Sequence, residues 1–151
     1  MSVRELLRKK PTGVISIESE ASVADAARLL MDREIGGLPV VDEEGAKLLG
    51  FVSEREIVDA VDGHSSGIRD LRVASIMRRP APVCSGDDGI RDVMERMTRG
   101  RLRHLVVLDH DRVAGVISVG DLVKDRLEQL ETETGVLRDY VAAQRAMNTT
   151  R

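Results

Sequence analysis

Apolar and polar positions along this chain follow one pattern twice, about 67 residues apart. The segment Ile35–Asp42 returns as Leu102–Asp109, and the segment Gly50–Ile57 returns as Gly115–Leu122. A fixed period of this kind indicates that each copy is one supersecondary unit, whose apolar face is covered by the other copy. We therefore expect two similar units that pack with pseudo-two-fold symmetry and leave a cleft between them.

Each copy has the hydrophobic periods of a strand, a helix, two further strands and a last helix. Pro39 belongs at the start of its strand or on a sheet edge, because proline cannot donate to a strand ladder. The predicted elements of the first copy are strands at 14–17, 38–41 and 48–52, with helices at 23–31 and from Ser53. Those of the second copy are a first strand that contains Cys84, a helix at 90–97, strands at 105–108 and 113–117, and a helix from Gly120. The expected fold class is α/β (α+β), with two βαββα repeats.

The domain boundaries follow from this pattern. We expect repeat 1 at residues 1–61, a linker at 62–72, repeat 2 at 73–127, and a C-terminal helix and tail at 128–151. A short helical lead-in precedes each copy, at residues 3–7 and at residues 73–77. The methionines, which occur at helical spacing, are expected to fill the core.

The last helix is predicted to run well past its repeat, with apolar residues at heptad-like steps. This seam consists of Val123, Leu127, Leu130, Thr134, Leu137 and Val141. So narrow a stripe indicates a partner helix, which favours a homodimer, or a helix that folds back onto its own domain. Gly135 within it is a position where the helix could kink or fray.

Composition limits the function. With 151 residues, a net charge of −3 and a single cysteine, the chain has neither a nucleic-acid footprint nor a disulfide framework. Aromatic stacking platforms are nearly absent, and we find no metal-ligand spacing, signal peptide or membrane-length apolar run. These features predict a cytoplasmic protein without nucleic-acid or membrane partners and without a metal.

A serine stands three residues before an acid at the start of the last helix of each copy, as Ser53 and Glu56 and as Ser118 and Asp121. This spacing is that of a capping box, which satisfies helix N–H groups without any ligand. It also suits a nucleotide, because a carboxylate can accept both ribose hydroxyl hydrogens and a helix start favours an anion. Glu56 is one methylene longer than Asp121, which weakens the ribose assignment in the first copy.

These segments, together with Val73–Met77, resemble the cystathionine-β-synthase (CBS) domain, of which two normally pack as a Bateman module. The resemblance covers residues 1 to about 127, and the tail resembles that of stand-alone bacterial CBS pairs. It implies a non-catalytic regulatory module that binds an adenine nucleotide, most often AMP, between the repeats and relays its state to an unidentified partner protein. Some members instead bind NAD(H), S-adenosylmethionine or a cyclic dinucleotide.

The resemblance also implies the site residues. Site 2 is expected to comprise Ala81, Pro82, Arg103, His104, Leu105, Ser118, Gly120 and Asp121. Site 1 is expected to comprise Val14, Ile15, Gly37, Leu38, Pro39, Ser53, Arg55 and Glu56. Arg103 and His104 resemble the basic pair that reaches nucleotide phosphates in gamma subunits of the AMP-activated protein kinase, although a pair of strand-edge surface residues would look the same.

Two other classes of function compete with this interpretation. Enzyme motifs for phosphate loops, zinc proteases and serine hydrolases are absent, and no nucleophile–base pair can be named, so we expect no catalytic residues and no catalytic cofactor. A ligand-free scaffold for protein–protein contact remains the alternative.

Overall fold

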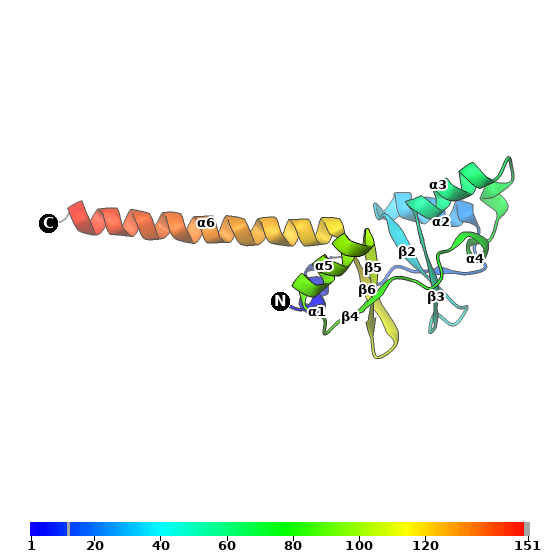
Figure 1. Cartoon of the computed structure of the whole chain (residues 1–151), viewed down its shortest axis with the longest axis horizontal. Coiled ribbons are helices and arrows are strands. Elements are labelled where there is room, and N and C mark those ends of the chain that lie inside the picture. The colour runs from blue at the N-terminus through cyan, green and yellow to red at the C-terminus, as the bar shows by residue number, and fades with distance from the viewer. Residues whose placement is uncertain (12, 150–151) are drawn as a thin grey trace. The chain divides into compact units, whose positions relative to one another are not determined.

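The structure is a computed structural model that describes residues 1–11 and 13–149, so the last two residues of the predicted tail lie outside it. The chain divides into two units, Met1–Ser118 and Val119–Arg151. The first holds the strands and the shorter helices, whereas the second consists of helix α6 (Val119–Thr149) (Figure 1). Within the described residues, no helix has the length and apolarity required to cross a membrane.

The first unit contains two three-stranded sheets of the same topology, which confirms the predicted mixed α and β repeats. In each sheet the first strand pairs parallel with the middle strand, and the third strand pairs antiparallel with it. The strands of the first sheet are β1 (Ile17–Glu18), β2 (Gly37–Val41) and β3 (Leu48–Ser53). Those of the second sheet are β4 (Val83–Ser85), β5 (His104–Asp109) and β6 (Arg112–Ser118).

At Ser2, Ser22 and Ser53 a capping box begins a helix of this unit. Ser22 caps α2 through a capping box with Asp25, in which the Asp25 N–H donates to Ser22 Oγ at 3.0 Å. The helices are α1 (Val3–Lys9), α2 (Val23–Arg33), α3 (Glu54–Gly63), α4 (Val73–Ile76) and α5 (Ile90–Gly100), with a 3₁₀ turn η1 (Ile68–Asp70). Helix α3 ends at Gly63, so it extends two residues into the expected linker at 62–72.

Pro39 lies in β2, the middle strand, so the expectation of an edge or strand-start position is wrong. The sheet register pairs Pro39 with Phe51 of β3. Both backbone groups of Phe51 bond away from β2, since its N–H donates to Arg78 O at 3.0 Å and its carbonyl accepts from Arg78 N–H at 2.7 Å. Proline is tolerated here because no donor is required on this side.

Pro39 also affects β1, which pairs with β2 on the side opposite β3. It shortens this first strand. In the second repeat Val106, which occupies the place of Pro39, donates its N–H to Pro82 O at 2.8 Å. Proline cannot make the matching bond to the segment around Ile15. The first strand accordingly begins at Ile17 and not at residue 14 as predicted.

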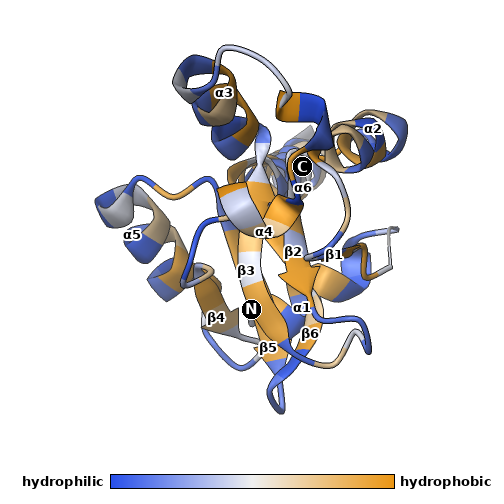
Figure 2. Ribbon diagram, turned by 90° about the vertical axis from the view of Figure 1, so that its right-hand side faces the viewer, coloured by the Kyte–Doolittle hydropathy of each residue, from blue (hydrophilic) through white to orange (hydrophobic). Residues whose placement is uncertain are grey.

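Each lead-in helix packs on the other repeat. At α1, the Val3 N–H donates to Asp88 O and the Arg4 N–H to Gly86 O, both at 2.9 Å, next to β4. At α4, the Val73 N–H donates to Ala21 O at 2.8 Å, at the start of α2. The two repeats are thereby interlocked, with each sheet covered in part by the segment that precedes the other (Figure 2).

The two cores use matching positions. The first is built from Ile17, Ala26, Leu30, Leu38, Val40, Val52 and Val73. In the second repeat, Cys84 occupies the place of Ile17 and is buried, as its strand position predicted. Burial raises the pKa of its thiol to about 11, so Cys84 stays neutral and acts as a small apolar residue. Figure 2 shows the strands largely in the hydrophobic colour.

The expectation that the methionines fill the core is correct only in part. Met97 is buried, and Met77 packs against the first core. Met31 and Met94, by contrast, expose 79% and 40% of their surface on α2 and α5. The helical spacing predicted an apolar face, and part of that face points outward.

The second unit is the long helix predicted from the seam. It continues through Gly135 without interruption, so the kink considered there is absent. The apolar residues of the seam are exposed, with exposed fractions of 52% for Val123, 55% for Leu127, 42% for Leu130 and 61% for Leu137.

Candidate functional site

The sheet register pairs one predicted site residue of each middle strand with the serine of the motif at one end of the hairpin. In the first repeat Gly37 of β2 pairs with Ser53 at the end of β3. In the second repeat His104 of β5 pairs with Ser118 at the end of β6. The Ser-x-x-acid motifs therefore begin directly beside the segments Gly36–Gly37 and Arg103–His104.

In the first repeat the Ser53 and Glu56 motif forms a capping box. The Ser53 N–H donates to Glu56 Oε2 at 2.8 Å, and the Ser53 hydroxyl donates to the same oxygen. The Glu56 carboxylate is thus used to satisfy the start of α3. Arg55 lies on the helix surface, where its Nε is 4.0 Å from Asp59 Oδ2.

In the second repeat the motif crosses the boundary between the two units. Ser118 is the last residue of the first unit and is half-buried, whereas Gly120 and Asp121 lie in the first turn of α6. Arg103 is exposed beside β5. The ribose and phosphate roles of these residues stay predictions.

His104 makes a contact between the repeats that the sequence did not predict. Its ring centroid lies 5.5 Å from that of Phe51 in β3, with the planes tilted by 42°. A Cβ added at Gly36 would be 2.9 Å from His104 Nε2, and one added at Gly37 would be 2.3 Å from Phe51 Cζ. The glycine pair of the first repeat thus leaves room for two rings, one from each repeat. The only signal in the sequence was that the second copy carries Arg103 and His104 where the first carries two glycines.

Gly37→Ala is expected to lower the free energy of unfolding by about 1–3 kcal/mol, because overpacking a buried site forces its neighbours to move. Phe51 is only 3% exposed, so its ring cannot swing into solvent to make room. Urea unfolding measures the effect. Gly63→Ala is the matched control, since its added Cβ would meet nothing within 4 Å. If both variants unfold at the wild-type midpoint, the ring pair does not restrict this position.

The apolar residues of the predicted sites differ in exposure. Leu38, Pro39 and Leu105 are fully buried, so in this conformation they support the site from beneath. Ile15, Ala81 and Pro82 are half-buried, and Val14 is 51% exposed. A base could therefore reach the chain segments that lead into β1 and β4 more readily than the middle strands.

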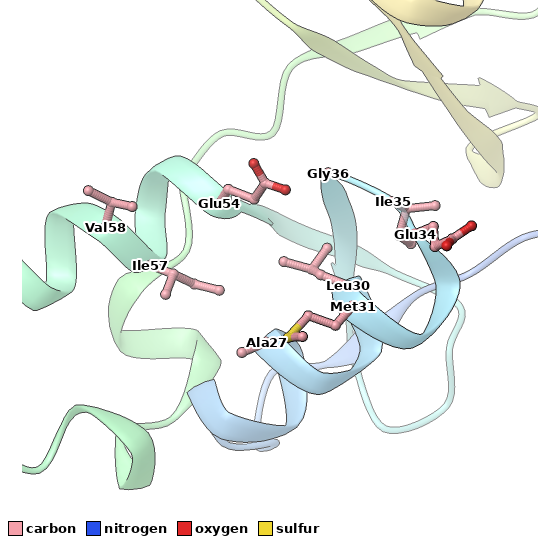
Figure 3. A pocket seen from close by; sticks show the side chains of 9 residues that line it. All are labelled: Ala27, Leu30, Met31, Glu34, Ile35, Gly36, Glu54, Ile57 and Val58. Atoms are coloured by element: carbon pink, nitrogen blue, oxygen red, sulfur yellow. The ribbon is translucent and has the colours of Figure 1, made fainter.

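A pocket of about 550 Å³ lies elsewhere, between α2 and α3 of the first repeat (Figure 3). Its apolar lining comes from Ala27, Leu30, Met31, Ile35, Ile57 and Val58. Glu34 and Glu54 stand on either side of Gly36 in Figure 3. The pocket contains none of the predicted nucleotide-site residues. Within the described residues, no cluster of three or more His, Cys, Asp or Glu side chains could hold a metal.

Comparison with known proteins identifies the class. The family model of the CBS domain matches residues 3–63 and 73–128, and the chain therefore belongs to the CBS-domain family, as a tandem pair. The crystal structure of a CBS-domain protein from Agrobacterium tumefaciens superposes with a TM-score of 0.77 at 35% identity, covering 83% of this chain and 99% of that one.

A second solved structure is the CBS domain pair of a protein in complex with 5′-methylthioadenosine and S-adenosyl-L-methionine. It has a TM-score of 0.73 at 26% identity and covers 85% of this chain and 98% of that one. Inosine-5′-monophosphate dehydrogenase of Methanocaldococcus jannaschii is 30% identical over 115 residues, which is 75% of this chain and 22% of the enzyme. The chain spans 36% and 41% of the length of two further relatives from that organism.

Proposed function

We propose that this CBS pair is a non-catalytic regulatory module that binds an adenine nucleotide, AMP foremost, in the cleft between its repeats. The observation that supports the proposal is the register that pairs Ser118 with His104, the residue that follows Arg103 in the chain. A hydroxyl, an imidazole and a guanidinium can each donate to a phosphate, and these three groups come from neighbouring segments of the second repeat. The relative solved with 5′-methylthioadenosine and S-adenosyl-L-methionine supports an adenosine-containing ligand.

In this proposal Asp121 accepts the ribose hydroxyl hydrogens, and Arg103 attracts the phosphate. The base lies against Ala81 and Pro82. The ligand acts by favouring one arrangement of the two repeats, which changes the surface offered to a partner protein and requires different affinities for the two arrangements.

A thermal-shift screen tests the proposal. Ligand that binds only the native state raises the melting temperature by mass action. We expect AMP, ADP or ATP to raise it and guanosine nucleotides to leave it unchanged. A shift with S-adenosylmethionine or NAD(H) alone would keep the sensor role and change the ligand. No shift with any of these compounds would favour the ligand-free scaffold.

The two sites of one chain are expected to be unequal. The first site carries Glu56, which is one methylene longer than Asp121, and has glycines where the second has Arg103 and His104. The second site is therefore expected to bind more tightly, with the first weak or empty. Calorimetric titration that gives two equivalent sites per chain would contradict this prediction.

We also propose that the protein is a homodimer, built by the helices of the repeats and stabilised by the seam of α6. The exposed apolar residues on α2 and α3, and separately those on α6, support it, because exposed apolar surface marks association sites. Sedimentation that shows only monomer at tens of micromolar protein would contradict it.

A further inference from the structure

The helices of both repeats present apolar side chains to solvent. In the first repeat Met31 of α2 is 79% exposed, and Val58 and Val61 of α3 are 64% and 56% exposed. The pocket of about 550 Å³ lies between these two helices (Figure 3). In the second repeat Met94 of α5 is 40% exposed. The helices of each repeat therefore expose apolar side chains, and we call the two surfaces the α2–α3 face and the α5 face.

The structure makes α2 and α5 equivalent residue by residue. Each ends at a left-handed C-cap residue, Glu34 with φ 53° and Arg101 with φ 52°. The residue after each cap bonds to the helix in the same way, since the Ile35 N–H donates to Leu30 O at 3.0 Å and the Leu102 N–H donates to Met97 O at 2.9 Å. Positions 67 residues apart therefore occupy the same place on the two helices.

The charges at these equivalent places are reversed. Three exposed positions of α2 and its C-cap carry charged side chains, the first positive and the other two negative. The equivalent position at α5 carries the opposite charge in each case. The pairs are Arg28 and Glu95, Asp32 and Arg99, and Glu34 and Arg101. In the part of the chain that the structure describes, Asp32, Glu34, Arg99 and Arg101 take part in no ion pair.

Reversed charge beside exposed apolar side chains points to one partner, a second copy of this chain in a defined orientation. We infer that two copies associate head to tail, with the α2–α3 face of one on the α5 face of the other. A two-fold axis then creates the same contact twice, and both copies bury both faces. The inference rests on the proposed homodimer and specifies its orientation.

Electrostatics selects head to tail over head to head. In the head-to-tail dimer, Asp32 and Glu34 of one copy approach Arg99 and Arg101 of the other. In a head-to-head dimer, acidic residues would approach acidic residues and basic residues would approach basic ones. Unlike charges favour the first arrangement, and like charges in contact disfavour the second.

Charge reversal in the full-length chain tests the orientation. The variant D32R/E34R makes the α2–α3 face basic, and the variant R99E/R101E makes the α5 face acidic. A third variant combines all four substitutions. At an ionic strength of about 0.05 M, where screening is weak, each double variant is expected to raise the dimer dissociation constant at least about tenfold. The quadruple variant restores opposite charges across both contacts, so its dissociation constant is expected to return to within about threefold of wild type. Sedimentation equilibrium measures all four proteins.

E43R/E44R is the matched control for D32R/E34R, because it makes the same change in net charge in the exposed turn between β2 and β3. Circular dichroism establishes that every variant is folded. Unchanged dissociation constants in both double variants would overturn the head-to-tail orientation while the homodimer stands. So would a quadruple variant that is weaker than either double variant. A wild-type protein that is monomeric would instead refute the homodimer itself.

Discussion

Asp121→Ala is expected to lower the affinity for AMP about ten- to a hundredfold. A hydrogen bond to a charged group contributes about 1.5–3 kcal/mol, and each 1.4 kcal/mol corresponds to about a factor of ten in the dissociation constant. Because Asp121 is proposed to hold the ribose, the loss should be the same for AMP and for adenosine. Calorimetric titration with both ligands measures it.

Two further variants sharpen this prediction. Asp139→Ala removes an exposed carboxylate farther along α6 and is expected to bind AMP like the wild type. Arg103→Ala should weaken AMP and leave adenosine nearly unchanged, since it removes only the phosphate contact. If Asp121→Ala binds AMP normally, Ser118 and Asp121 form only a helix cap. If Arg103→Ala weakens both ligands equally, Arg103 is a structural surface residue.

The variant L130D/L137D is expected to weaken the homodimer by at least about a hundredfold. Burying a leucine side chain contributes about 1.5–3 kcal/mol, and a two-fold dimer loses four of them. Both leucines are exposed in the single chain, at 42% and 61%, so their replacement leaves the core of the repeats intact. Sedimentation equilibrium measures the dimer, and circular dichroism measures the fold.

The control for this variant is T132D/A143D, which places the same two charges on the opposite side of α6. It is expected to dimerise like the wild type. If L130D/L137D also dimerises normally, the seam is not part of the interface and the repeat helices alone hold the dimer. If both variants lose helix content, the effect comes from the helix itself and the seam has no special role.

Much of the fold could be predicted because the period of the pattern repeats. The strands at 38–41 and 105–108 and the helices that precede them follow from apolar spacing, and the structure has them within a few residues. The short β1 was missed, because it depends on a bond that Pro39 cannot make to a segment far away in the sequence. The exchange of lead-in helices was missed because Val3 and Val73 have the same pattern whichever repeat they cover.

The spacing of apolar residues along the chain did not show whether a given apolar side chain faces the core of its own repeat or the solvent. Met31 and Met94 lie at helical spacing like Met97, but only Met97 faces the core of its own repeat. For the site, spacing located Ser53 and Ser118 at helix starts, since capping is local. The contact between His104 and Phe51 joins the two repeats, and no local rule predicts such a pair.

Equilibrium dialysis of the wild-type protein against labelled AMP tests the proposed nucleotide binding most directly, because it counts bound ligand without relying on heat or unfolding. We predict saturable retention of AMP that is competed by unlabelled AMP and is reduced in Asp121→Ala. Folded protein that retains no AMP, ADP or ATP at millimolar concentrations would contradict the proposal and leave the CBS pair as a scaffold for protein contacts.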